Sequence, residues 1–332
     1  MNASKPQDLT AGLPPEAPTL ADIEQAAARI RPYAHLTPVL TSSALNERIG
    51  AQLFFKCENF QKVGAFKFRG AANAVFSLSD AEARRGAATH SSGNHAQALA
   101  LAARLRGIPA HIVMPDNSPK VKVEAVKGYG GRILFCRPTQ EERERTLAEV
   151  VRETGAAFIH PYDNPRVIAG QATAARELLA EVRGLDLLLA PVGGGGLASG
   201  TALAARYLSP ATRVVAVEPA GADDAQRSLR EGKIVPSLNP RTVADGLRTS
   251  LGRLTFPILR ALLAEVVTVS EEGIVAAMRL VWERMKILIE PSAAVPVAAL
   301  LEGGLQARGL RVGVILSGGN LDLDVLPWLP PR

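Results

Sequence analysis

Lys67 is the first residue whose surroundings suggest chemistry. It lies between Phe66 and Phe68 in the segment GAFKFRG, directly after the apolar run LFFKCENF. Burying a lysine ammonium is costly unless the charge is paired or lost. This segment alone leaves two explanations open. Either the stem packs while the ammonium reaches water, or a desolvated, neutral amine serves as a nucleophile.

A run of four glycines is the second chemical feature. The segment VGGGGLASG follows an apolar run and opens a helical pattern. Without a Cβ atom the backbone can approach an anion closely, and the first N–H groups of a helix attract negative charge. The segment therefore predicts a phosphate site, although a tightly packed turn between a strand and a helix has the same composition.

The same glycines also fit a dinucleotide-binding motif. Gly193, Gly195 and Ala198 match G-x-G-x-x-A, and Glu218 ends the next apolar run near the spacing of a ribose-binding acid. A nicotinamide-type oxidoreductase that binds a dinucleotide is therefore an alternative. It assigns no role to Lys67 or to the segment SSGNH, so the rest of the chain must decide between the two hypotheses.

The elements that must position these residues alternate along the chain. The apolar run AATHSS leads into GNHAQALALAARLRG, RILFC into TQEERERTLAEVVRETG, and DLLLAPV into GLASGTALAARYL. Such alternation predicts an α/β fold with parallel sheets covered by helices. ATHSSGNH, PVGGGG and LSGGN each place small residues directly after a strand. Because ligands bind beyond the carboxyl ends of strands in open α/β sheets, these turns predict one crevice.

Composition and charge argue against several classes of protein. The 332 residues are 47% hydrophobic and 21% charged, which is ordinary for a globular enzyme. The net charge is +6, but the basic residues are scattered and aromatics are only 5%, so nucleic-acid binding is not expected. The N-terminal residues lack the apolar core of a signal peptide, and no membrane span is expected, so a cytoplasmic location is predicted. Cys57 and Cys136 are expected to be buried.

Seven segments, in order along the chain, resemble the serine racemase and serine/threonine dehydratase family of fold type II pyridoxal-phosphate enzymes. They are FQKVGAFKFRGAANAV, SSGNHAQALA, APVGGGGLASG, VEPAGADD, ADGLRTSLG, RMKILIEPSAAV and LSGGN. The resemblance spans nearly the whole chain. It implies two open, mostly parallel sheets with helices on both faces. It also implies a small domain at residues 85–163 and a large pyridoxal-phosphate domain made of 1–84 and 164–332. Within the first part, residues 1–17 are expected from their composition to be a flexible extension.

The resemblance implies how this chain would hold pyridoxal 5'-phosphate. Lys67 would attach the cofactor covalently and act as the catalytic base, and Phe66 would pack beside the ring, unless it belongs to the core. Asn94 would donate a hydrogen bond to the phenolic oxygen, and Ser317 would face the pyridine nitrogen. A neutral serine there makes the ring a weaker electron sink, which suits prompt loss of a leaving group. The phosphate would bind the backbone amides of Gly193, Gly194, Gly195 and Gly196.

The same resemblance implies where the substrate would bind. The loop that receives its carboxylate would consist of Ser91, Ser92, Gly93, Asn94 and His95. Hydroxyl and N–H groups are natural carboxylate donors. His95 is expected to donate a hydrogen bond, because Lys67 already supplies the base. In a racemase, the Ser92 hydroxyl would be the second catalytic group, on the face opposite Lys67. Arg143 would meet a second carboxylate or a β-substituent.

The resemblance also implies a cation site in the segment EPAGADD. Glu218, the Ala222 carbonyl and Asp224 would bind a divalent cation. Oxygen ligands suit hard ions, so Mg²⁺ is expected, with Ca²⁺ or Mn²⁺ as alternatives. Two solvated acids at a helix start, where the helix dipole stabilises them, are the other explanation.

The predicted reaction is α,β-elimination of water from a β-hydroxy amino acid such as L-threonine or L-serine, giving a 2-oxo acid and ammonia. Three departures from the racemases leave the substrate open. Ala65 replaces a serine, Val63 a threonine, and Tyr162 a smaller polar residue near the substrate. Serine racemisation, dehydration of hydroxyaspartate or an aryl-serine, and non-catalytic cofactor binding are the alternatives. The expected partners are a small amino acid and a second copy of the chain in a homodimer, with no nucleic acid or membrane.

Overall fold

The computed structural model describes residues 9–329, which form two β-sheets. The larger sheet has six strands in the order β1 (Val39–Leu40), β2 (Gln52–Cys57), β10 (Arg311–Leu316), β7 (Leu187–Pro191), β8 (Arg213–Pro219) and β9 (Glu265–Val269). The smaller sheet has four in the order β5 (Arg132–Cys136), β4 (Ala110–Pro115), β3 (Ala87–His90) and β6 (Ala157–Phe158). All pairings are parallel except that of β1 with β2. The predicted α/β fold with two mostly parallel sheets is confirmed.

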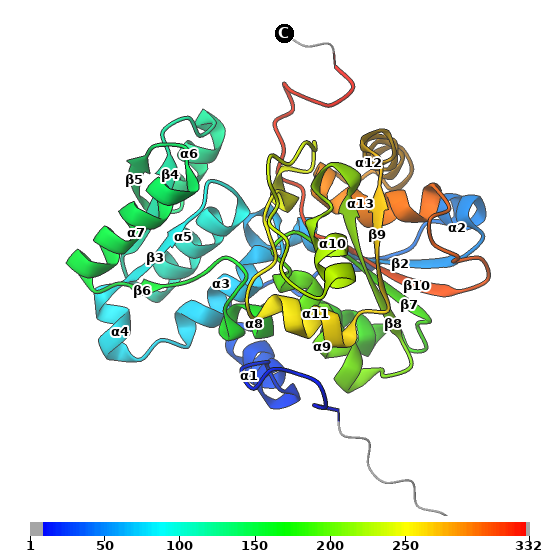
Figure 1. Cartoon of the computed structure of the whole chain (residues 1–332), viewed down its shortest axis with the longest axis horizontal. Helices are drawn as coiled ribbons and strands as arrows, with labels where there is room; N and C mark the ends of the chain where they lie inside the picture. The colour runs from blue at the N-terminus through cyan, green and yellow to red at the C-terminus, as the bar shows by residue number, and fades with distance from the viewer. Residues whose placement is uncertain (1–8, 330–332) are drawn as a thin grey trace, which may run out of the picture.

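Helices surround both sheets (Figure 1). The α-helices are α1 (Leu20–Ile30), α2 (Ser43–Ile49), α3 (Lys67–Phe76), α4 (Asp80–Arg85), α5 (Asn94–Arg106), α6 (Lys120–Gly128), α7 (Gln140–Thr154), α8 (Pro165–Glu181), α9 (Gly196–Leu208), α10 (Asp224–Glu231), α11 (Thr255–Leu262), α12 (Glu271–Met285) and α13 (Pro291–Leu301). The short 3-10 helices are η1 (Glu58–Phe60), η2 (Lys62–Gly64), η3 (Ala220–Ala222) and η4 (Asp245–Leu247). Figure 1 shows the smaller sheet with α4 to α7 on the left and the larger sheet on the right.

The larger sheet is buried on both faces. Successive side chains of a strand point to opposite faces. On β7, Leu187 and Leu189 pack in a core with α12 and α13, whereas Leu188 and Ala190 pack with α8 and α9. Because both sets are buried, the strand is a continuous apolar run instead of an alternating one. This explains why the segment LLLA predicts a central strand.

The smaller sheet is also covered on both faces. On β3, Ala88 packs toward α7 and Ala87 toward α5. All four of its strands lie within residues 85–163, for which a small domain is predicted. The domain boundaries themselves stay a prediction. Cys57 and Cys136 are free and buried, as predicted.

The segment before α1 contacts the body of the protein. Leu13 and Ala17 pack against the core formed by α8 and α9, and the Tyr207 hydroxyl donates to the Pro18 carbonyl at 3.2 Å. These contacts concern the later part of the extension predicted to be flexible; residues 1–8 lie outside the described residues. Within residues 9–329, no helix is both long and apolar enough to cross a membrane.

The carboxyl ends of the strands converge between the two sheets. β3 ends at His90, β7 at Pro191 and β10 at Leu316. A β-bridge between Ala65 and Gly318 joins the segment before α3 to the segment after β10. The residues that follow these strands therefore share one region with the start of α3.

Candidate active site

A cavity of about 560 Å³, here called the cleft, lies at these strand ends. Its walls come from the turns after β3, β7 and β10, the start of α3, and residues of α6 and α7. Every residue predicted to touch cofactor or substrate lines it: Phe66, Lys67, Ser91, Ser92, Gly93, Asn94, His95, Arg143, Gly193, Gly194, Gly195, Gly196 and Ser317. The crevice predicted from the small-residue turns is therefore present. The roles of the individual residues stay predictions at this point.

Lys67 is the first residue of α3, and its amine lies inside the cleft. Nζ donates to the Pro161 carbonyl at 2.8 Å and lies 5.2 Å from the centroid of the Phe66 ring. Phe68, in contrast, is fully buried in the core. Burial lowers the pKa of Lys67 to about 8, although the Glu290 carboxylate acts in the opposite direction. A neutral amine, able to act as nucleophile or base, is therefore accessible near neutral pH.

The four glycines form the turn between β7 and α9. Gly195 has a φ of +89°, which disfavours any residue with a Cβ. A Cβ on Gly194 would lie 2.4 Å from the Tyr162 ring, and one on Gly195 would lie 2.8 Å from the Thr255 Cβ. No described side chain caps the first N–H groups of α9. The turn therefore offers free amides at a positive helix end, which suits a phosphate group.

The loop between β3 and α5 presents hydroxyls and amides to the cleft. Ser91 Oγ accepts a hydrogen bond from the Gly93 amide at 3.3 Å. His95 Nε2 lies 3.2 Å from the Ile159 carbonyl, which can only accept, so Nε2 carries the hydrogen. Burial, and then the charge of Lys67, keep the pKa of His95 well below its ordinary value. The hydrogen bond that His95 donates therefore goes to the protein, and Nδ1 is an acceptor without a partner among the described residues.

Glu290 is a cleft residue to which the sequence analysis assigns no role. Its carboxylate accepts from Asn94 Nδ2 at 3.0 and 3.2 Å and from the Asn320 amide at 3.1 Å. Asn320 Nδ2 in turn donates to Asn94 Oδ1 at 2.9 Å. Burial raises the pKa of Glu290 to about 7. The acid stands in the quoted segment IEPSAAV, directly before the proline that opens α13, and this helix-start position is the only sequence signal for it.

Arg143 lines the cleft from α7. Its Nε atom is buried and has no hydrogen-bond partner among the described residues. Such a donor loses its water without gaining a bond, which favours binding of a ligand that accepts from it. Arg145, two positions along the same helix, is 61% exposed and pairs with Glu142 at 2.7 Å. The contrast makes Arg143 the candidate for contact with an anionic group.

An ion pair joins the two walls of the cleft. Lys122 on α6 and Asp245 in η4 lie 2.5 Å apart and both line the cavity. Their separation of 123 residues along the chain gives no sequence signal of the contact. The ion pair therefore connects α6, which packs with the smaller sheet, to η4, which lies between two strands of the larger sheet in the chain.

The predicted cation ligands lie together outside the cleft lining. Glu218 is near the end of β8, Ala222 is in η3, and Asp224 begins α10. Glu218 accepts from the amides of Ala225 and Gln226 at 3.1 and 2.7 Å, and Asp224 Oδ2 is buried without a partner among the described residues. Burial raises the pKa of Glu218 to about 8 and that of Asp224 to about 6. Within residues 9–329, no three acidic, histidine or cysteine side chains converge as a metal site.

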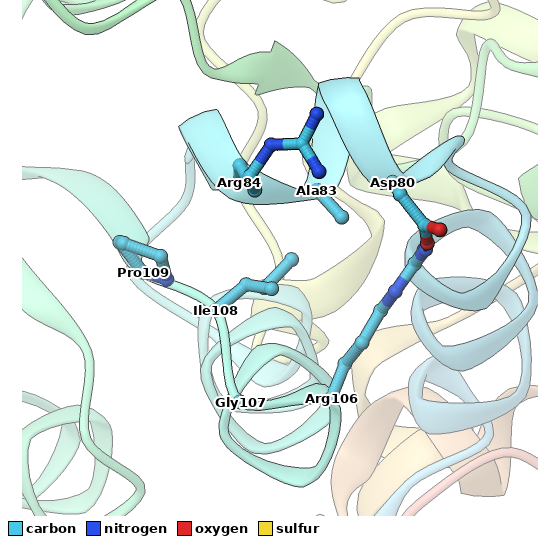
Figure 2. Close-up of a pocket in the computed structure, with 7 residues that line it drawn as sticks. All are labelled: Asp80, Ala83, Arg84, Arg106, Gly107, Ile108 and Pro109. Carbon is cyan, nitrogen blue, oxygen red and sulfur yellow. The ribbon is translucent and has the colours of Figure 1, made fainter.

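A second, shallower hollow of about 430 Å³ lies between α4 and the turn after α5 (Figure 2). Arg106 crosses it, pairing weakly with Asp80 at 3.8 Å and donating to the Leu78 carbonyl at 2.6 Å. The residues that line the hollow include no nucleophile, so it offers no chemistry comparable to that of the cleft.

Known proteins resemble this chain over nearly its whole length. Residues 30–318 match the family described as "Pyridoxal-phosphate dependent enzyme". The chain is 54% identical to a β-hydroxyaspartate dehydratase of Paracoccus denitrificans, over 94% of this chain and 99% of that one. It is 50% identical to an L-threo-3-hydroxyaspartate ammonia-lyase of Saccharomyces cerevisiae, over 92% and 94%. The structure of serine racemase from Dictyostelium discoideum matches with a TM-score of 0.89 and 48% identity, over 94% and 100%.

Proposed function

Because this chain belongs to the pyridoxal-phosphate dependent enzymes, we propose that it removes water from a β-hydroxy amino acid, releasing a 2-oxo acid and ammonia. The observation that carries the proposal is Lys67, a cleft lysine whose pKa burial lowers to about 8, beside a glycine turn with free amides. The ammonia-lyase and dehydratase among the relatives support the reaction type. The family match also removes the reason for a dinucleotide site, since it accounts for both Lys67 and the glycines.

The residues of the cleft fit the cofactor. A Cβ at Gly194 would collide with the Tyr162 ring and one at Gly195 with the Thr255 side chain, so only glycine allows the turn that presents these amides. Lys67 Nζ is the amine that would attach the aldehyde, and Ser317, 2% exposed at the end of β10, is the candidate hydroxyl for the pyridine nitrogen. When bound, pyridoxal phosphate withdraws electron density from the Cα atom of an attached amino acid. Phe66 is the candidate for contact with the ring.

The chain's own groups then handle the protons and orient the substrate. Lys67 Nζ takes the proton from Cα, because a lowered pKa keeps a share of this amine neutral. The Ser91 and Ser92 hydroxyls supply donors to the α-carboxylate, and the Gly93 amide, which donates to Ser91 Oγ at 3.3 Å, would share its hydrogen with it. Asn94 is held by Glu290 and Asn320, so its carboxamide must share a donor if it also contacts the cofactor.

We propose further that the preferred substrate carries a second carboxylate, as 3-hydroxyaspartate does. The support is Arg143, which lines the cleft with an unpaired, buried Nε. Removing a hydrogen bond to a charged group costs about 1.5–3 kcal/mol, which corresponds to roughly a 10- to 100-fold change in affinity. The names of two relatives, a β-hydroxyaspartate dehydratase and an L-threo-3-hydroxyaspartate ammonia-lyase, agree with this substrate class.

The test is a panel of L- and D-serine, L- and D-threonine and each stereoisomer of 3-hydroxyaspartate, with 2-oxo acid and ammonia measured together. We expect 3-hydroxyaspartate to have the highest kcat/KM. Arg143→Met should raise KM for 3-hydroxyaspartate at least about 10-fold while changing KM for serine much less. Arg145→Met, on the exposed side of α7, is the matched control. No 2-oxo acid from any member of the panel would refute the proposed function.

Racemisation of serine at the same site is the second candidate, favoured by the serine racemase relatives. Lys67 reaches one face of Cα, and racemisation needs a proton donor on the other. Ser92, which lines the cleft, is the candidate for that role. Ser92→Ala should therefore remove racemisation, measured by chiral chromatography, while elimination from the L-isomer remains measurable.

Three further proposals concern the cation, the assembly and the location. The buried Asp224 Oδ2, which has no partner among the described residues and is near enough to Glu218 to raise its pKa, supports a divalent cation, Mg²⁺ first, with the Ala222 carbonyl as the third ligand. A homodimer is supported by the exposed apolar side chains of Phe60 and Leu288, whose segments are joined by the hydrogen bond from Asn59 Nδ2 to the Leu288 carbonyl. The cytoplasmic location stays a prediction.

A further inference from the structure

A carboxylate that binds inside a cavity needs more than one donor. The second carboxylate of the proposed substrate would lose water in the cleft, and such an anion is stable only when hydrogen bonds satisfy its remaining lone pairs. Arg143 offers one buried donor without a partner among the described residues, its Nε atom. A further donor beside Arg143 would complete a dicarboxylate site, and His90 is placed to supply it.

His90 is the last residue of β3, and its side chain lies on the face of the smaller sheet that α7 covers. Successive side chains of a strand point to opposite faces. Ala88, two residues earlier, packs with Leu147 and Val150 of α7. His90 therefore points toward the helix that carries Arg143, and both residues line the cleft. The two side chains share one wall of the cavity.

Two neighbouring rings hold the His90 ring by packing. The Phe158 ring stacks on it, with centroids 6.0 Å apart and planes inclined by 28°. The His160 ring meets it edge-on, with centroids 6.3 Å apart and planes inclined by 88°. Burial lowers the pKa of His160 to about 4, so this neighbour is uncharged at neutral pH. The ring of His90 is therefore oriented without an ionic contact to either neighbour.

The nitrogens of His90 are available to a ligand. Neither of them forms a hydrogen bond with another described residue, whereas rings of His95 and His160 bond to the backbone. Burial lowers the pKa of His90; the charge of Glu144 opposes this effect, and that of Arg143 adds to it. At neutral pH the ring is therefore uncharged, with one N–H donor and one nitrogen acceptor.

We propose that His90 donates a hydrogen bond to the second carboxylate of the substrate, next to Arg143, an inference that rests on the proposed function. Arg143 supplies the opposite charge, and His90 adds a donor without a second positive charge in the empty cleft. Glu144, the acid of α7 that acts on His90, is exposed and accepts from Gln140 Nε2 at 2.6 Å, so it is engaged elsewhere. Serine and threonine have no second carboxylate, so the contact selects for a dicarboxylate.

Binding of unreactive acids to the holoenzyme tests the contact apart from catalysis. Malate is 3-hydroxyaspartate without its amino group, and 3-hydroxypropionate is serine without its amino group. His90→Phe keeps an aromatic ring against Phe158 and removes both nitrogens. By titration calorimetry, we expect it to weaken malate binding at least about 10-fold, because hydrogen bonds to charged groups are the strong ones. Binding of 3-hydroxypropionate should stay close to that of wild type.

Steady-state kinetics measures the same contact during turnover. In His90→Phe, KM for 3-hydroxyaspartate should rise at least about 10-fold, while KM and kcat for serine stay near wild type. His90→Asn and His90→Gln place an N–H donor near the former Nδ1 and Nε2, and at least one of them should recover part of the loss. His111→Phe is the matched control, since His111 lies on β4 of the same sheet but outside the cleft lining, and it should change neither substrate.

The outcomes separate this inference from the proposed function. Equal losses for malate and 3-hydroxypropionate in His90→Phe would overturn it, because His90 would then only support the loop after β3. Unchanged malate binding would overturn it as well. A wild type that uses serine but neither binds malate nor uses 3-hydroxyaspartate would refute the inference and leave dehydration standing. Malate binding that depends on His90, with no 2-oxo acid formed from any β-hydroxy amino acid, would refute the proposed function and keep the His90 contact.

Discussion

Two groups of buried charges lie within a few residues of each other along α3, and they are built in opposite ways. Arg69 is fully buried and forms ion pairs at 2.7 Å with both Glu58 and Glu177. Lys56 is fully buried as well and pairs with Glu177 at 2.6 Å. These carboxylates raise the pKa of Arg69 against the effect of burial. Every charge in this network meets an opposite one.

The cleft, two residues earlier on α3, holds polar groups that lack such partners. Among the described residues, Lys67 donates to a carbonyl and not to a carboxylate. His95 Nδ1 and Arg143 Nε have no hydrogen-bond partner among them. Glu290 accepts hydrogen bonds only from a side-chain carboxamide and a backbone amide. Burial shifts the pKa of Lys67 down and that of Glu290 up. The comparison indicates that the paired buried charges stabilise the fold, whereas the unpaired ones are the groups we propose to bind a ligand.

Removing one member of the paired network should have the largest effect on stability. Arg69→Leu leaves Glu58 buried without its counter-charge, which typically costs about 3–5 kcal/mol. Urea unfolding of the cofactor-free protein measures the loss. Arg145→Leu, which breaks an exposed ion pair, should cost far less, because solvent screens such pairs. Equal losses in the two variants would show that the Arg69 network does not stabilise the fold in the way described.

Glu290 should make the stability of the cofactor-free protein fall as pH rises. Its pKa is about 7 in the folded state against an ordinary 4.5, so the folded protein binds more protons between these values. The stability contribution is complete below about pH 4.5 and is lost through about pH 7, for a total on the order of 3 kcal/mol. As the pH is raised from about 4.5 to above 7, the free energy of unfolding of wild type should therefore fall relative to that of Glu290→Gln. A constant difference between the two proteins would contradict the shift.

The cation site should give the smallest effect. A ligand that binds only the folded protein at 100 times its Kd adds about 2.7 kcal/mol, so excess Mg²⁺ should raise the melting temperature over that in chelator. Asp224→Asn should abolish the difference. Asp223→Asn, which alters the neighbouring and more exposed acid paired with Arg227, should keep it. No response to any divalent cation, with no ion found by elemental analysis, would refute the site.

The sheets and the position of the cleft could be predicted because both depend on local sequence. Buried strands such as β7 are short apolar runs between helical patterns, and the small residues that follow them must gather at one sheet edge. The local sequence singled out Lys67 and Gly193–Gly196 as candidates, and the family resemblance supplied their roles and the other residues of the cleft. The helices on both faces follow from strands that are apolar at every position.

The partners of the buried charges could not be predicted, because they are distant in the chain. Glu290 meets Asn94 across 196 residues, and Arg69 meets Glu177 across 108. No periodicity or spacing relates such positions, and the glutamates themselves look like ordinary helix-end acids. For the same reason, the sequence could not predict that His95 donates its hydrogen bond to the Ile159 carbonyl. Tertiary contact, not local pattern, decides which buried group is paired.

The central claim is that Lys67, and no other lysine, carries the cofactor. The most direct test is to reduce the purified protein, expected to be yellow, with borohydride and to locate the pyridoxyl group by peptide mass spectrometry. Lys62 is the internal control, since its Nζ lies 5.8 Å from the centroid of the Phe68 ring on the same segment, outside the cleft lining. The account predicts the label on Lys67 and none on Lys67→Ala. A label on Lys62 or any other lysine, or a label retained in Lys67→Ala, would contradict it.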